Sequence, residues 1–173
     1  DVKFANQNGN LEYVWATSWG VSTRLMGALI MTHGDDKGLV LPPNLAPIQV
    51  VIVPIFKGKE QLEEISIVAE NIKHELESKN VRVQFDNREN LKPGFKFAEH
   101  EMKGIPVRIA IGPKDIEKKQ LELARRDIEK KIFIKQSIVF TEVEKILKEI
   151  HTNLFERAKR FLNENITEVD NYD

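Results

Sequence analysis

The chain has 173 residues, of which 41% are hydrophobic and 31% are charged, and its formal net charge at pH 7 is −1. These values are typical of a globular protein with one domain, or one domain plus a fragment, and they exclude binding of nucleic acid through a global excess of positive charge. Without cysteine the chain has no disulfides or thiolate metal sites, and no apolar run approaches the roughly 20 residues that span a bilayer.

The chain opens with the pattern of a β-hairpin. No initiator methionine or signal-peptide pattern is present at Asp1, so we expect a cut inside a longer protein. Residues 7–10 read QNGN, which is a strong turn signal, and residues 11–17 are β-rich and predict the return strand.

A helix with an arginine at its start is expected next. The hydroxyls of Ser22 and Thr23 suit a helix N-cap, and residues 25–31 are apolar on every face. Because a helix that is apolar all round is normally buried, we expect Arg24 at the mouth of a buried helix. An arginine at a helix N-terminus is a suitable site for an anion such as phosphate.

After this helix, a turn at residues 33–38 leads to a short strand, LVL, and then to three prolines that mark the expected domain boundary. Beyond the boundary, apolar runs and helical spacing alternate, with Gly104 expected just after the end of a helix. The expected strands are 49–56, 81–85 and 106–111, with weaker ones at 120–126 and 132–134, and the expected helices are 60–79, 95–103 and 137–163. This order predicts an α/β fold with a mixed sheet of about five strands flanked by helices.

Two blocks of sequence carry a resemblance to a known family. They read SWGVSTRLMGALIMTHGDDKGLVLPPNLAPIQVVIVPI and KPGFKFAEHEMKGIPVRIAIGPKD. The first resembles the third signature motif of class II aminoacyl-tRNA synthetases in its prolyl form, running into the anticodon-binding domain, and the second is similar to that domain. Thr23 stands where the general motif has an acidic residue, and only Gly20 of its glycines remains before it, as in the prolyl variant.

The resemblance to the prolyl-tRNA synthetase family implies three regions. Residues 1–47 would be a strand–helix–strand edge of the catalytic domain, and residues 48–165 the anticodon-binding domain. The ending ITEVDNYD resembles the entry to a C-terminal, zinc-type extension, so residues 166–173 would be its truncated start.

The same resemblance assigns residues to an active site. Arg24 would be catalytic by gripping the ATP γ-phosphate, with Ser22 and Thr23 beside the nucleotide, and Ser18 and Trp19 would line the proline pocket. The intact enzyme would use ATP with Mg²⁺ and tRNA-Pro, and it would be a cytoplasmic homodimer without a membrane partner. Since the first two class II motifs are missing, we expect the fragment to hold no cofactor and to be inactive alone.

An RNA-reading surface is expected on the helix predicted at 95–103. Phe97 and Glu101 are four residues apart and share one face, while Phe95, Ala98 and Met102 would form the opposite, core-facing stripe. RNA loops are read by stacking on aromatics, and an ionised glutamate can accept from the donor edge of the guanines that a proline anticodon requires. Further family positions that meet the anticodon are matched by Arg108, Lys114, Asp115 and, less closely, Lys130.

Several other interpretations stay open. Arg24 could be an ordinary salt-bridge residue, Phe97 could belong to the core, and the mixed charges at 117–131 are typical of a solvated face. The Asp35-Asp36 pair favours turn chemistry over Mg²⁺, and the four histidines lack metal-ligand spacing, so we expect no metal site. The alternative functions are a stand-alone RNA-binding or accessory module on the same fold, and a sibling synthetase for threonine, glycine or histidine.

Overall fold

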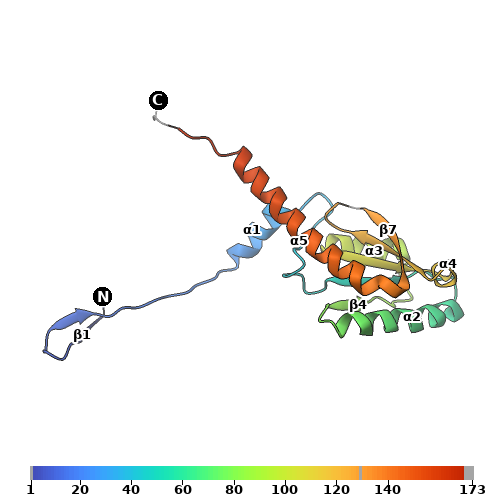
Figure 1. Cartoon of the computed structure of the whole chain (residues 1–173), viewed down its shortest axis with the longest axis horizontal. Helices are drawn as coiled ribbons and strands as arrows, with labels where there is room; N and C mark the ends of the chain where they lie inside the picture. Colours follow the sequence, from blue (N-terminus) through green and yellow to red (C-terminus); the bar gives the residue numbers. More distant parts are fainter. Residues whose placement is uncertain (1, 129, 170–173) are drawn as a thin grey trace.

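A five-stranded mixed β-sheet forms the centre of the computed structural model (Figure 1), which describes residues 2–128 and 130–169. Its strands are β3 (Val50–Pro54), β4 (Val83–Phe85), β5 (Val107–Ile111), β6 (Gln120–Arg125) and β7 (Lys131–Lys135), in the spatial order β4-β3-β5-β6-β7. β3 pairs in parallel with β4 and β5, while β6 and β7 join in antiparallel pairing. The mixed five-stranded sheet predicted from the sequence is therefore confirmed.

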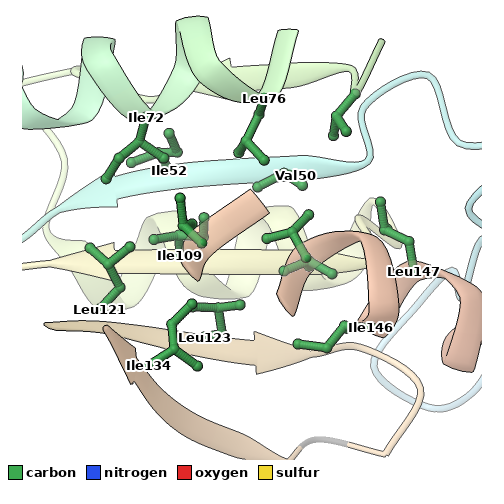
Figure 2. Close-up of a cluster of buried hydrophobic side chains, with 14 of the residues drawn as sticks. Val50, Ile52, Ile72, Leu76, Ile109, Leu121, Leu123, Ile134, Ile146 and Leu147 are labelled. Carbon is green, nitrogen blue, oxygen red and sulfur yellow. The ribbon is translucent and has the colours of Figure 1, made fainter. Parts of the chain in front are cut away.

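Helices α2 (Lys59–Glu77) and α5 (Val139–Glu164) cover one face of this sheet, and η1 (Gln136–Ile138) leads into α5. The main hydrophobic core lies between these helices and the sheet, and alternate positions of each strand contribute to it (Figure 2). Its labelled members include Val50, Ile52, Ile109, Leu121 and Ile134 from the strands. Each large aliphatic side chain buried here stabilises the fold by about 1.5–3 kcal/mol.

Helix α3 (Pro93–Met102) packs against β3 on the opposite face of the sheet. The second, smaller core contains Val51, Val53 and Ile105, with Phe97 and Ile48 partly buried against it. Gly104 follows the helix with a positive φ of 72°, as expected for the residue after a helix end. The two faces thus differ, because α2 and α5 cover one broadly and α3 is the helix packed on β3 from the other side.

The N-terminal hairpin is confirmed, with β1 (Lys3–Ala5) pairing with β2 (Leu11–Tyr13), and it stands away from the rest of the molecule (Figure 1). The return strand ends four residues earlier than predicted. The expectation that the next helix, α1 (Arg24–His33), is buried is wrong, since none of its residues is buried. Thr23 takes the N-cap position, but its side chain makes no capping hydrogen bond.

The exposure of α1 has a simple structural reason. In the described chain α1 packs against α5, as Figure 1 shows, and its apolar surface is otherwise left uncovered. Leu25, Met26 and Met31 are each more than 60% exposed. An apolar helix of this kind needs further partners to be buried, and its sequence pattern does not say on which chain segment they lie.

The strand predicted at residues 39–41 is also wrong. Its backbone instead bonds to the end of α3, because the Leu39 amide donates to the Met102 carbonyl at 2.9 Å and the Leu41 amide to the Gly104 carbonyl at 3.3 Å. A Cβ atom at Gly38, whose φ is 127°, would come within 2.6 Å of the Met102 carbonyl oxygen, so this approach requires glycine.

The proline-rich segment that follows is packed into the same body as the sheet. Val40 and Ala46 are buried, and Arg82 donates to the backbone carbonyls of Ala46 and Pro43, each at 2.9 Å. The boundary between residues 47 and 48 stays a prediction.

Three further features complete the chain. The short helix α4 (Pro113–Glu117) was not predicted, because five residues give no periodic pattern; the Gly112 amide donates to the Asp115 side chain at 2.9 Å and caps it. Residues 166–169 have no regular secondary structure, and the remainder of the predicted extension, 170–173, lies outside the described residues. Within the described residues, no helix is long and apolar enough to cross a membrane.

Candidate functional site

A pocket of about 360 Å³ lies between α3 and the sheet face on which α3 packs. Its floor is one row of register partners across four strands, since Val51 pairs with Arg108, Arg108 with Ala124, and Ala124 with Lys131. The other residues that line it are Lys37, Gly94, Phe97, Ala98, His100, Glu101, Ile105, Arg125 and Arg126. Sheet register and one helix thus bring together side chains that are distant in sequence.

An aromatic–guanidinium stack forms one wall of the pocket. The guanidinium carbon of Arg108 lies 3.7 Å from the centre of the Phe97 ring, within the range of a cation–π contact. Burial lowers the pKa of Arg108, and the carboxylates of Glu122 and Glu101 oppose that effect. The group still carries its charge near neutral pH, because the ordinary pKa of arginine is far above 7.

Glu122 lies beside this stack and links it to the next strand. Its Oε1 is 3.6 Å from an Arg108 nitrogen and 3.3 Å from the Lys131 ammonium. The Arg108 Nε is enclosed and has no hydrogen-bond partner among the described residues. Arg108 and Lys131 therefore bring positive charge to the pocket, while Glu122, which does not line it, pairs with both.

Glu101 is on the same wall as Phe97, one helical turn further along α3. The predicted sharing of a face by these two residues is confirmed, because both line the pocket. The Glu101 carboxylate lies 3.6 Å from the Lys37 ammonium and is partly exposed. It is therefore an accessible acceptor beside an aromatic stack.

The other half of the α3 prediction is wrong. Phe95, Ala98 and Met102 were expected to face the core, yet all three are exposed. The buried polar positions of α3 are Lys96, which is 0% exposed, and His100, which is 2% exposed. A hydrophobic pattern misses this arrangement because it counts lysine and histidine as solvent-facing.

A buried carboxylate explains why these two side chains point inward. Asp86, directly after β4, lies with Oδ2 2.8 Å from His100 Nε2, and its backbone carbonyl accepts from the Lys96 ammonium at 2.9 Å. Arg88 donates to both carboxylate oxygens, at 2.8 Å and 2.7 Å. A buried charge is tolerated only when it is paired and hydrogen-bonded in this way.

The electrostatics of the cluster keep Asp86 ionised. Hydrogen bonds from Arg88 hold the pKa of the Asp86 carboxyl well below its usual range, against the effect of burial and with help from His100. Arg88 also donates to Glu99 at 2.6 Å, and the bonds from Lys103 and Arg88 lower the pKa of Glu99 to about 2. The Asp86 cluster, meaning Asp86, Arg88, Lys96, Glu99 and His100, thus ties α3 to the sheet.

A second ion pair attaches the segment before the sheet. Arg126 donates to Asp35 at 2.7 Å and 2.5 Å and to the Glu101 carbonyl at 3.0 Å. The bonds from Arg126 lower the pKa of Asp35 to about 2. Asp35 therefore takes part in a turn and an ion pair, and the turn chemistry expected for this residue is observed.

Not every predicted RNA contact lies in the pocket. Lys114 and Asp115 are on α4, beyond the far end of β5, and Asp115 caps that helix. Lys130 is exposed next to Lys131, which does line the pocket. Sequence reasoning missed Lys37, Arg126 and Lys131; the alternation in β7 could have indicated Lys131, whereas the other two depend on tertiary packing.

The residues assigned to ATP lie together elsewhere. Ser22, Thr23 and Arg24 line a shallow hollow at the start of α1, with Gly27, Ala28 and Met31. Ser18 and Trp19 do not line it, and Trp19 is 94% exposed. A guanidinium and hydroxyls at the N-terminus of a ten-residue helix suit a polyphosphate, but they form only one wall of a site.

Comparison with known proteins now defines the family. Residues 49–150 match the family model described as "Anticodon binding domain". The chain belongs to this family. Curated relatives of the anticodon-binding chain include "Proline--tRNA ligase" of Christiangramia forsetii, 61% identical over 173 residues, and that of Bacteroides fragilis, 53% identical over 173 residues. All of the chain aligns with each relative, but it spans only 35% of their length.

A solved structure agrees with this result. The crystal structure of prolyl-tRNA synthetase from Cryptosporidium parvum, complexed with L-proline and AMP, matches 99% of the chain with a TM-score of 0.89 and 42% identity. The chain covers 37% of that protein. The resemblance to the prolyl-tRNA synthetase family is confirmed.

The Asp86 cluster leads to a prediction about stability. Replacing Asp86 by Asn leaves the buried Lys96 without its counter-charge and Arg88 paired with Glu99 alone. The loss of one partner of a buried pair costs about 3–5 kcal/mol. We expect Asp86→Asn to lower the free energy of unfolding by about that amount, measured by urea denaturation at pH 7. The exposed Asp36→Asn is the matched control and should change it little.

The pH dependence of the free energy of unfolding tests the same carboxylates. A carboxyl whose folded pKa is depressed stabilises the fold above its unfolded pKa, about 4, and that stability is lost as pH falls through the folded value. Wild-type stability should therefore fall below pH 4 as Asp86, Asp35 and Glu99 protonate. A slope below pH 4 that is the same in Asp86→Asn and wild type would contradict the role of Asp86.

Proposed function

We propose that the chain is the anticodon-reading part of a proline--tRNA ligase and that it binds the anticodon of tRNA-Pro in the pocket between α3 and the sheet. The observation that carries this proposal is the Phe97–Arg108 stack, at 3.7 Å, in one pocket with the Glu101 carboxylate. The identity of 61% to a proline--tRNA ligase over the whole chain supports the choice of amino acid over its siblings. A stand-alone accessory module gains no support from these relatives.

The chemistry of the pocket suits guanine. The Watson–Crick edge of guanine presents N–H donors, which the acceptor-only carboxylate of Glu101 can receive, while the base stacks against the planar Phe97–Arg108 pair. Lys37 and Lys131 line the same pocket and can neutralise the phosphates that flank the bound base. Discrimination against other bases follows, because a base without N–H donors on that edge would gain no hydrogen bond from the Glu101 carboxylate, which would keep only its ion pair with Lys37.

We assign the remaining predicted residues to contacts outside the pocket. Lys114, Asp115 and Lys130 would meet the anticodon loop beyond the guanines, and this assignment is supported by the family resemblance. Lys114 and Lys130 are exposed and have the charge that phosphates attract.

We assign the N-terminal region of the chain to the activation of proline. The intact ligase would form prolyl-adenylate and transfer proline to tRNA in the cytoplasm, as a homodimer. Arg24 would hold the γ-phosphate, with Ser22 and Thr23 beside it and Ser18 and Trp19 on the proline side. ATP, with Mg²⁺, would supply the adenylyl group that joins the proline carboxylate, with pyrophosphate as the leaving group. The residues of this chain would contribute positioning and charge stabilisation.

Replacing Glu101 by Ala tests the anticodon assignment. We expect Glu101→Ala to weaken binding of the tRNA-Pro anticodon stem-loop about tenfold or more, because the acceptor for guanine is lost. Stem-loops with other anticodons should lose little. Glu63→Ala on the far face of the sheet is the matched control, and equilibrium titration is the measurement; equal weakening across all stem-loops would make Glu101 a structural residue.

The outlying contacts are tested by salt dependence. Each phosphate contact in single-stranded RNA contributes a slope of about −0.7 to log K against log [salt]. Neutralising Lys114 or Lys130 to Gln should therefore flatten the slope by about 0.7 each, with little change in preference among anticodons. Lys145→Gln on α5 is the control, and a slope equal to that of the wild type would remove the residue from the interface.

Proline activation by the chain alone is tested by ATP–pyrophosphate exchange. We expect no proline-dependent exchange, because Ser22, Thr23 and Arg24, which line an exposed hollow, would supply only one wall of the proposed nucleotide site. A full-length relative serves as the positive control. Proline-dependent turnover by residues 1–173 would show that this wall is sufficient.

A further inference from the structure

The sheet face that carries the pocket continues onto the edge strand β7. Side chains of β7 alternate, and Ile132 and Ile134 pack on the main core. Lys131, Phe133 and Lys135 therefore point to the opposite face, the one with the pocket, and all three are exposed. Phe133 is 62% exposed, which is a large apolar surface to leave in water on an open sheet.

Phe133 is next to the pocket in the sheet register. It pairs directly across with Glu122, which lies 3.6 Å from Arg108 and 3.3 Å from Lys131. Arg108 in turn stacks on Phe97. Glu122 thus lies between Phe133 and the Phe97–Arg108 stack on the same face of the sheet.

Protection of an exposed sheet edge explains only part of this pattern. Lysines on an edge strand discourage pairing with another sheet, and Lys131 and Lys135 satisfy that need. An exposed phenylalanine between them has the opposite effect, since it adds apolar surface to the same edge. The exposure of the Phe133 ring therefore needs a different explanation from the exposure of the two lysines.

We propose that Phe133 is a second stacking platform, which holds a nucleotide next to the base bound in the pocket, with Lys131 and Lys135 on the flanking phosphates. The proposal rests on the proposed function and extends its RNA surface by one nucleotide. Sites for single-stranded nucleic acid combine aromatic platforms with basic side chains that follow the backbone. Lys131 and Lys135 are about 13 Å apart along the strand, with the ring midway between them.

RNA fits this surface better than a protein partner does. The surface joins Phe133 to Arg108, Lys131 and Lys135, with Glu122 as the single carboxylate among these five residues. It is also continuous with the pocket through Glu122, as the ion pairs show. Positive charge around an exposed ring is suited to a base and its phosphates.

The test measures binding of the anticodon stem-loop by substituted chains. We expect Phe133→Ala and Phe133→Leu to weaken binding about tenfold, because base–aromatic stacking is lost in both, and Phe133→Tyr to bind like the wild type. Phe161→Ala, an exposed phenylalanine on α5, is the matched control and should leave affinity unchanged. Thermal unfolding of each variant checks that the fold is intact.

Abasic RNA separates stacking from other causes. The nucleotide on each side of the guanine pair is made abasic in turn, and the Phe133→Ala effect should vanish with one of these two loops. If Phe133→Ala binds the stem-loop as tightly as the wild type does, the platform is overturned. It is also overturned if the loss of affinity in Phe133→Ala persists with both abasic loops. Both outcomes hold even where the wild type still prefers the guanines. If the wild type shows no preference for guanines, the proposed function fails instead, and an effect that vanishes with abasic RNA still supports the platform.

Discussion

The feature on which the rest of the site depends is the buried carboxylate of Asp86. A charge enclosed at that depth must be paired. Arg88 and His100 contact the carboxylate at 2.7–2.8 Å, and the Lys96 ammonium lies 3.6 Å from it while donating to the Asp86 backbone carbonyl at 2.9 Å. Two of those partners are on α3, so satisfying the carboxylate also sets the rotation of that helix. Once Lys96 and His100 point inward, Phe97 and Glu101 are turned toward the pocket, so the Asp86 cluster sets which side chains of α3 line it.

The sheet supplies the other half of the site through its register. Because partners in adjacent strands lie side by side, Val51, Arg108, Ala124 and Lys131 form one row under α3. A shift of one residue in β5 would turn Arg108 into the main core and break the stack on Phe97. The main core therefore specifies the binding surface indirectly, since burying Val107 and Ile109 on one face leaves Arg108 on the other.

The sequence predicted the alternating elements well, since long apolar runs such as 49–56 and the helical spacing in 60–79 leave few options. It also placed Phe97, Glu101 and Arg108 in one site, through a resemblance that the relatives confirm. It misplaced the buried face of α3, because the attraction of Asp86 for Lys96 and His100 overrides hydrophobic periodicity. It also missed the burial of Val40, Pro42, Pro43 and Ala46 and the exposure of α1. Both depend on which surfaces meet in space, and a local sequence pattern holds no information about that.

The proposed reading of guanine in the pocket depends most on Glu101. A double-mutant cycle tests it most directly, pairing Glu101→Gln with a stem-loop in which one anticodon guanine is inosine, which lacks the exocyclic amino donor. Binding is measured for all four combinations, and the account predicts a coupling energy of about 0.5–3 kcal/mol at one of the two guanine positions. Strictly additive losses at both positions would show that Glu101 and the guanine amino groups do not meet, and would contradict the claim.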